Sequence, residues 1–379
     1  MKDTSFSVAK ALAIFFMVLA HSGCPSWISG FVSMFHMPFF FICAGYFFKA
    51  AYWDNGQPFV ERRIKRLYVP FVKWSVVMLC LHNVLSLTGI ISGRGSELYD
   101  WHTFFQHVWS CLFNMSGYDN ITCGAYWFFR TLLLVSLAYW LLGALLRRLR
   151  LRVWHKSLFI GIPALLMAVW MCGEGLRMTG VAQGGYRELM GLYFFSCGAI
   201  YHELEPRIRH QWAYALGGLV VLVVFQLVGW RAALTYTSTV GRCFSLALTG
   251  LLGFMMLRVA SQWLVRLPGK LVRPLAYIGE HTLYIFAFHA LAFRLVSMIK
   301  IGVYHLPWSQ MGNQMVVTYR TDDAFFLLYT LFGMAVPLLV RIVWIRYDNR
   351  SAWAFCQDTW RSLKKTYRDI MDASDTKDE

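Results

Sequence analysis

Long apolar runs, separated by short polar and basic segments, follow one another along almost the whole chain. A membrane-spanning helix needs about 20 apolar residues, and ten runs of this kind occur. The predicted spans are 6–23, 29–49, 67–91, 126–146, 157–173, 188–202, 212–230, 240–258, 272–300 and 324–345. The run at 272–300 is long enough to be tilted or broken at Gly279. The pattern predicts an all-α, polytopic transmembrane helical bundle over residues 1–350.

Two other segments have a different pattern. The stretch "WHTFFQHVWSCLFNM" at 101–115 is too polar to span a membrane, and its aromatic side chains share one side of a helix. Such a helix lies in the membrane interface, where aromatic residues are enriched. The tail at 351–379 combines tryptophan, phenylalanine and basic residues with the polar end "SDTKDE". We expect it to be a cytoplasmic, amphipathic and polar segment.

The composition excludes a water-soluble enzyme. Hydrophobic residues make up 58% of the 379 residues, and charged residues only 15%. One soluble core cannot bury so much apolar surface. The chain is therefore expected to be a multi-pass membrane protein.

The basic residues determine the predicted orientation. With a cytoplasmic N-terminus, 26 Lys and Arg lie in inner segments and 7 in outer loops. This asymmetry follows the positive-inside rule and predicts that both termini are cytoplasmic and that the 92–125 loop is outside. Topology and attraction to anionic membrane lipid also account for the net charge of +16, so no nucleic-acid partner is expected.

Lys10 and His21 are two ionisable residues in the first apolar run. Eleven helical positions advance the chain by about 16 Å and return to nearly the same direction, so the two side chains share one face. Ionisable residues inside membrane spans are costly and mark functional sites, although each residue alone also fits an ordinary interfacial position. The pair suggests a site that extends along one helix.

Further ionisable residues fall at two depths. His36, His82 and His289 lie in the middle-to-outer part of their spans, like His21, and we expect the four imidazoles to line a shared polar cavity. His82 has an alternative role as a bridge between helices. The cytoplasmic ends of neighbouring spans carry a group of cations, namely Lys10, Arg62, Arg63, Lys65, Arg66 and Lys73. The predicted molecule has a cationic inner mouth and an imidazole-lined outer chamber.

Five segments in order resemble the acyltransferase type 3 family of integral membrane acyltransferases. They are the basic-x10-His pattern of the first span, "FHMPFFFICAGYFF" at 35–48, "RRIKRLYVPFVKW" at 62–74, "YWFFRTLLL" at 126–134 and "YIGEHTLYIFAFHAL" at 277–291. Two positions depart from the family pattern. Ser7 stands where many members have an acidic partner for the basic residue, and Ala44 stands where serine is common.

The resemblance implies a membrane O-acetyltransferase of the bacterial cytoplasmic membrane that uses acetyl-CoA as acyl donor. The acceptor would be a hydroxyl group of a cell-surface or lipid-linked carbohydrate, and no metal is implied. The residues that match the family segments are then catalytic (His21, His36), donor-binding (Lys10, Arg63, Arg66, Lys73) and substrate-binding (Trp127, Arg130, His289). Arginine and lysine suit the anionic phosphates of acyl-CoA.

Between the two catalytic histidines, register favours His21 as the general base. It shares a face with Lys10, which suits a donor stretched along one helix, whereas Pro38 disturbs the helix next to His36. A neutral imidazole could take the hydroxyl proton as the oxygen attacks the thioester. A covalent acyl-imidazole relay is an alternative route.

Two other functional classes stay open from the sequence. A secondary transporter or flippase for an amphipathic sugar derivative could use buried His and Arg as coupling residues. A non-catalytic sensor could keep the same scaffold without turnover. The absence of an internal repeat and the register of Lys10 with His21 favour the enzyme.

Overall fold

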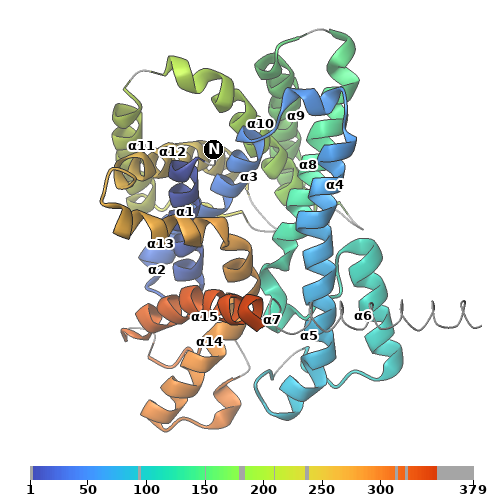
Figure 1. The fold of residues 1–379 in the computed structure, drawn as a ribbon, viewed down its shortest axis with the longest axis vertical. Helices are drawn as coiled ribbons and strands as arrows, with labels where there is room; N and C mark the ends of the chain where they lie inside the picture. Colours follow the sequence, from blue (N-terminus) through green and yellow to red (C-terminus); the bar gives the residue numbers. More distant parts are fainter. Residues whose placement is uncertain are drawn as a thin grey trace, which may run out of the picture.

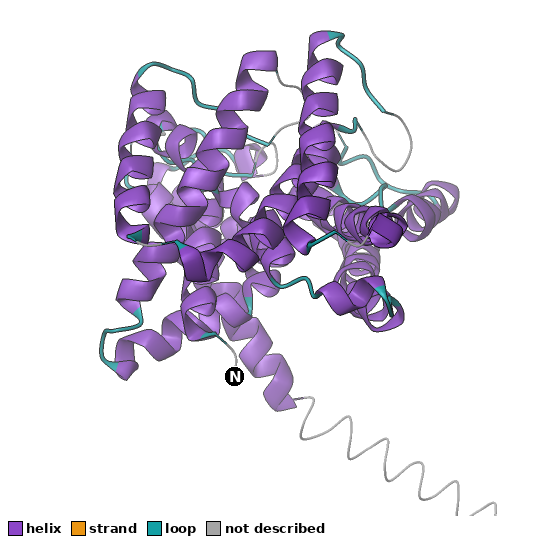
Figure 2. Ribbon diagram, turned by 90° about the horizontal axis from the view of Figure 1, so that it is seen from above, coloured by secondary structure: helices purple, strands orange, loops and turns teal. Residues whose placement is uncertain are grey.

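The fold is a bundle of helices joined by short loops. The computed structural model describes residues 3–92, 95–149, 151–178, 184–208, 210–234, 239–311, 315–320 and 323–347. These residues contain helices and loops but no β-strand (Figure 2). The predicted tail at 351–379 lies outside the described residues.

The helices follow one another in an order close to the predicted one. They are α1 (Thr4–His21), α2 (Ser26–Ser33), α3 (His36–Tyr46), α4 (Gln57–Arg63), α5 (Val69–Leu87), α6 (Trp101–Asn114), α7 (Asn120–Cys123), α8 (Trp127–Leu145), α9 (Val153–Gly173), α10 (Tyr186–Leu204), α11 (Gln211–Leu227), α12 (Val240–Leu264), α13 (Gly269–Glu280), α14 (Thr282–Tyr304) and α15 (Phe325–Tyr347). The prediction of a polytopic helical bundle is confirmed.

Eight segments of the described chain are long and apolar enough to cross a membrane. The other two predicted spans, at 188–202 and 212–230, form α10 and α11. Helix α10 has 19 residues but includes several charged positions, and α11 has only 17. Both predicted helices are therefore present, but α10 is too polar and α11 is too short to count among the eight segments.

Two predicted spans are each built from two helices. The span at 29–49 divides into α2 and α3 at Met34 and Phe35. The span at 272–300 divides at His281, into α13 and α14, and not at Gly279. Gly279 instead allows close packing, because a Cβ atom there would lie 1.6 Å from the Ser7 carbonyl oxygen. Its small size lets α13 cross directly over α1 (Figure 1).

Helix α1 is the centre of the packing. It contacts α2, α3, α12, α13, α14 and α15, and half of its residues are buried. Helix α3 packs closely on α10 because Gly45 has no side chain. A Cβ atom at this position would lie 1.8 Å from the Phe195 carbonyl oxygen and would clash with it. Small residues allow this approach between membrane helices. Helix α1 is therefore surrounded by helices from both the N-terminal and the C-terminal parts of the chain.

Helix α6 lies outside the main bundle, against α5 (Figure 1). Its aromatic residues Trp101, Phe105, Trp109 and Phe113 are each more than 60% exposed and recur every four residues. They therefore form one outward-facing ridge along the helix. This geometry agrees with the predicted interfacial helix.

Candidate active site

Helix α1 carries Lys10 and His21 as the sequence predicts. The 18-residue helix is continuous, so the side chains share a face and are separated by about 16 Å along the axis. Both residues are partly exposed. Within the described residues, Lys10 has no hydrogen bond or ion pair, and its charge lies near the buried Cys43 of α3. The helix thus presents an unpaired cation near one end and an imidazole at the other.

Three imidazoles come together around the end of α1. His21 Nδ1 lies 3.0 Å from His289 Nε2, and the two ring planes are inclined by 18° with centroids 5.2 Å apart. His36 is close enough to His21 for the rings to interact electrostatically. His36 Nδ1 donates to the Val32 carbonyl oxygen at 2.8 Å. The rings of His36 and His289 are buried, so His21 is the one of the three that is partly exposed.

His82 does not join this group. The expectation of four neighbouring imidazoles is therefore wrong for His82, whereas its other predicted role, as a bridge between helices, agrees with its contact to Asp119 at the start of α7. Its Nδ1 lies 2.8 Å from Asp119 Oδ2, and its Nε2 lies 3.0 Å from the Glu97 carbonyl oxygen. The ring also stacks on Tyr99, with centroids 3.7 Å apart. Both ring nitrogens of His82 therefore face acceptor oxygens. His82 anchors the loop between α5 and α8.

The four cations predicted to bind the donor share one property. Lys10, Arg63, Arg66 and Lys73 have no carboxylate partner among the residues that the structure describes. Arg63 lies over the ring of Phe59 at 5.0 Å, and Lys73 over the ring of Trp74 at 4.7 Å. A cation left without a carboxylate can accept an anionic ligand.

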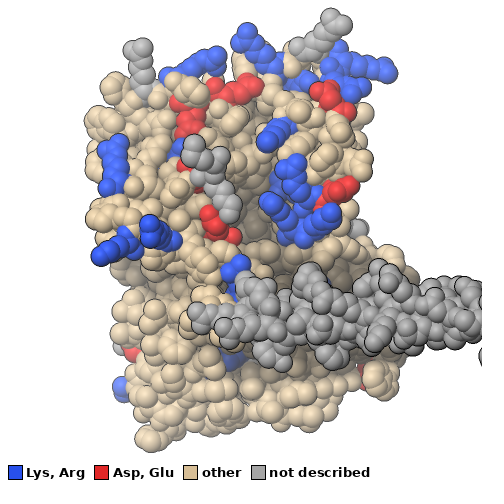
Figure 3. Space-filling model, in the orientation of Figure 1, with Lys and Arg blue, Asp and Glu red and all other residues tan. Residues whose placement is uncertain are grey.

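Lys10 lies on α1, and the other three cations lie on α4, on the π-helical turn Ile64–Tyr68 and on α5. Figure 3 shows Lys and Arg side chains gathered over α4 and the start of α5, beside a hollow in this face. Single π-helical turns are frequent at functional sites. Arg63 and Arg66 are three positions apart, and they are close enough for their like charges to interact.

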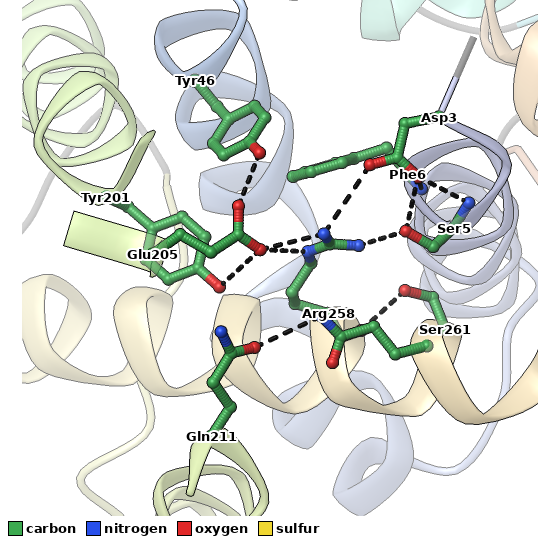
Figure 4. A network of polar contacts seen from close by, with 10 residues as sticks. Asp3, Ser5, Phe6, Tyr46, Tyr201, Glu205, Gln211, Arg258 and Ser261 are labelled. Carbon is green, nitrogen blue, oxygen red and sulfur yellow. Dashed lines mark hydrogen bonds and ion pairs between the residues drawn. The ribbon is translucent and has the colours of Figure 1, made fainter. Parts of the chain in front are cut away.

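Arg258 is a residue that the sequence analysis counted only toward topology. Its Nε and Nη2 donate to Glu205 Oε1 at 3.0 and 2.9 Å, and its Nη2 lies 3.7 Å from Asp3 Oδ2. The Tyr46 hydroxyl donates to Glu205 Oε2 at 2.5 Å. Figure 4 shows how this network joins α1, α3, α12 and the end of α10. Arg258 thus pairs with both carboxylates of the network, and Lys10 is bonded to neither of them in the described chain.

Arg130 and Trp127 lie against α10. The Arg130 guanidinium is fully buried, with Nη2 at 3.8 Å from Glu188 Oε1, and Arg187 covers the Trp127 ring at 3.9 Å. In the described chain, no hydrogen bond, ion pair or ring contact joins Arg130 or Trp127 to the three imidazoles. Glu188 was missed by the sequence analysis, although a carboxylate inside a predicted span is itself a signal.

The described residues contain no group of three or more His, Cys, Asp or Glu side chains placed to hold a metal ion. The ionisable groups of the candidate site are the three imidazoles and the cations described above. Together they can hold an anionic molecule and move a proton.

The chain matches a family model for an acyltransferase domain over residues 3–343. The match covers nearly the whole described chain, including every residue of the candidate site. Comparisons with curated proteins and with solved structures gave no match.

Proposed function

Because this chain belongs to the acyltransferase type 3 family, we propose that it transfers an acyl group, acetyl in the first instance, from cytoplasmic acyl-CoA to a carbohydrate hydroxyl. The acceptor would be extracytoplasmic or lipid-linked, and the membrane would be the bacterial cytoplasmic membrane. The family and the eight apolar helices make the protein a multi-pass membrane acyltransferase.

One observation carries the proposal most directly. His21, the partly exposed imidazole of the group, lies on the same helix face as the unpaired Lys10. Lys10, Arg63 and Arg66 would hold the phosphates of acyl-CoA, and the pantetheine arm would extend along α1 toward His21. The imidazole would then take the proton of the acceptor hydroxyl as its oxygen attacks the thioester carbon.

Substitution of the two catalytic candidates tests this proposal. The His21→Ala variant should lose acyl transfer by about 10²-fold or more in kcat, with normal membrane insertion and near-normal acetyl-CoA binding. The His36→Ala variant should retain turnover, because His36 is buried and its Nδ1 is bonded to the Val32 carbonyl oxygen of α2. Purified protein, acetyl-CoA and a panel of sugars would be scored for CoA release.

The opposite result would reverse the two roles. If His21→Ala kept more than a tenth of wild-type turnover while His36→Ala kept none, His36 would be the base. If the wild-type protein released no CoA with any sugar, the acetyl-CoA-to-sugar reaction would be the wrong assignment.

A further inference from the structure

The hydrogen bonds of His289 determine which of its nitrogens carries a proton. The ring is 1% exposed on α14, and Nδ1 lies 2.9 Å from the Phe286 carbonyl oxygen and 3.2 Å from that of Ile285. A carbonyl oxygen only accepts, so Nδ1 of His289 is the donor. No carboxylate is bonded to this ring within the described chain, and an unpaired buried charge would be costly. His289 is therefore neutral, with a lone pair on Nε2.

This assignment determines the tautomer of His21. His289 Nε2 can only accept, and it lies 3.0 Å from His21 Nδ1. The contact is a hydrogen bond only when His21 Nδ1 carries the proton. The neutral His21 ring then has its lone pair on Nε2. The backbone of α14 thus specifies, through two rings, which nitrogen of His21 is a base.

We propose that His289 is a positioning residue, and not a substrate-binding one, which holds His21 with Nδ1 protonated and Nε2 ready to accept a proton. The inference rests on the proposed function, in which His21 is the general base. His289 would orient His21 in the way that the aspartate of a Ser-His-Asp triad orients its histidine, by accepting a hydrogen bond from Nδ1.

The proton balance of the reaction is consistent with this arrangement. His21 Nε2 takes the hydroxyl proton while the acceptor oxygen forms a bond to the thioester carbon. The carbon–sulfur bond then breaks, and the proton passes from Nε2 to the departing CoA thiolate. His21 returns to the tautomer in which it began, and Nδ1 donates to His289 throughout.

His289→Phe and His289→Gln variants test the role. Phenylalanine keeps the ring shape but cannot accept, and glutamine places a carbonyl oxygen near the position of Nε2. With acetyl-CoA as donor and octyl β-glucoside as acceptor, His289→Phe should lower kcat by about 10- to 100-fold. Its KM for acetyl-CoA should stay within about twofold, because only the reacting group is affected. The His289→Gln variant should recover most of the turnover.

His281 provides a matched control. Its Nδ1 makes the same kind of bond, to the Tyr277 carbonyl oxygen at 2.7 Å, but it has no bond to His21. The His281→Phe variant should therefore keep wild-type kcat. An equal loss in both variants, or wild-type kcat in His289→Phe, would overturn the positioning role.

A second measurement does not depend on turnover. Protonated and unprotonated imidazole nitrogens have distinct ¹⁵N NMR shifts, and His21 is identified as the signal lost in His21→Ala. In the unmodified protein, Nδ1 of His21 should be the protonated nitrogen, and His289→Phe should change this distribution. A proton on Nε2 in the unmodified protein would refute the inference. Full turnover by His21→Ala would instead refute the proposed base and leave the tautomer measurement intact.

Discussion

At the residue scale, the partners of the cations separate structural charges from candidate binding charges. Lys65 pairs with Glu61, and Arg258 pairs with Glu205. Arg63 and Arg66 have no carboxylate partner in the described part of the chain. Positive charge beside the membrane is accounted for by topology alone, but topology does not require that these side chains remain unpaired. We therefore expect them to bind the phosphates of acyl-CoA.

Replacing Arg63 or Arg66 by alanine should raise the KM for acetyl-CoA by about tenfold, the equivalent of one lost charge-assisted contact. Lysine at either position should rescue only partly, because it lacks the planar fork of the guanidinium. Initial rates at varied acetyl-CoA concentration measure the effect. Arg62→Ala is the control, since Arg62 bonds to the Pro58 carbonyl oxygen on its own helix. An unchanged KM with less protein in the membrane would show that Arg63 and Arg66 serve topology only.

At the element scale, the beginning of α1 is held by one carboxylate with two functions. Asp3 caps the helix by accepting from the Ser5 and Phe6 amides at 2.9 and 3.3 Å, and it faces Arg258. Burial raises the pKa of Asp3. The hydrogen bonds from Ser5 and the charge of Arg258 together lower it by more than burial raises it, so the pKa of Asp3 lies below the ordinary 3.8. The lowered pKa means that the ionised carboxylate stabilises the folded protein.

This stabilisation is present above the ordinary pKa and is lost as the pH falls through the lower folded-state pKa. Asp3→Ala should reduce the free energy of unfolding at pH 7 by about 1 kcal/mol, the usual worth of a helix cap. The difference from wild type should shrink toward pH 3. Melting temperatures in detergent at both pH values measure it.

Asp100→Ala is the control for this substitution. Asp100 caps α6 by accepting from the Thr103 amide at 2.8 Å, but α6 lies outside the bundle. Its loss should therefore lower the melting temperature less. A difference between Asp3→Ala and wild type that is the same at pH 7 and pH 3 would argue against a role for the Asp3 charge.

At the scale of the whole molecule, orientation in the membrane rests on charge. The excess of 26 Lys and Arg in the predicted inner segments over 7 in the predicted outer loops predicts that the 92–125 loop is outside and that residues 147–156 are inside. In the structure, His82 and Asp119 tie this outer loop to α5. The loop and the cationic segments should therefore lie on opposite sides of the membrane.

Cysteine labelling tests the orientation. In a Cys80→Ser background, which removes an exposed native thiol, Leu98→Cys should react with an impermeant maleimide in intact cells. Leu149→Cys should react only after the membrane is opened. Both positions are exposed to a similar extent, 56% and 57%, so exposure does not separate them. Labelling in the reverse order would place both termini outside.

The sequence by itself determined the features that depend on neighbouring residues in the chain. These are the helical class, the positions of most spans, the helix α6 with its aromatic residues on one side, and the shared face of Lys10 and His21. Each follows from the length of an apolar run or from helical periodicity. The break at His281 was predicted two residues away, because Gly279 marks a close approach and not a helix end.

Only the tertiary structure decided which polar residues meet. His21 and His289 are 268 positions apart, and Arg258 lies 53 positions from Glu205. In a membrane protein, faces toward lipid and faces toward other helices are both apolar, so hydrophobic periodicity does not mark the inward face. The sequence therefore predicted four histidines at one depth in the membrane. Helix packing brings His21, His36 and His289 together and places His82 beside Asp119 instead.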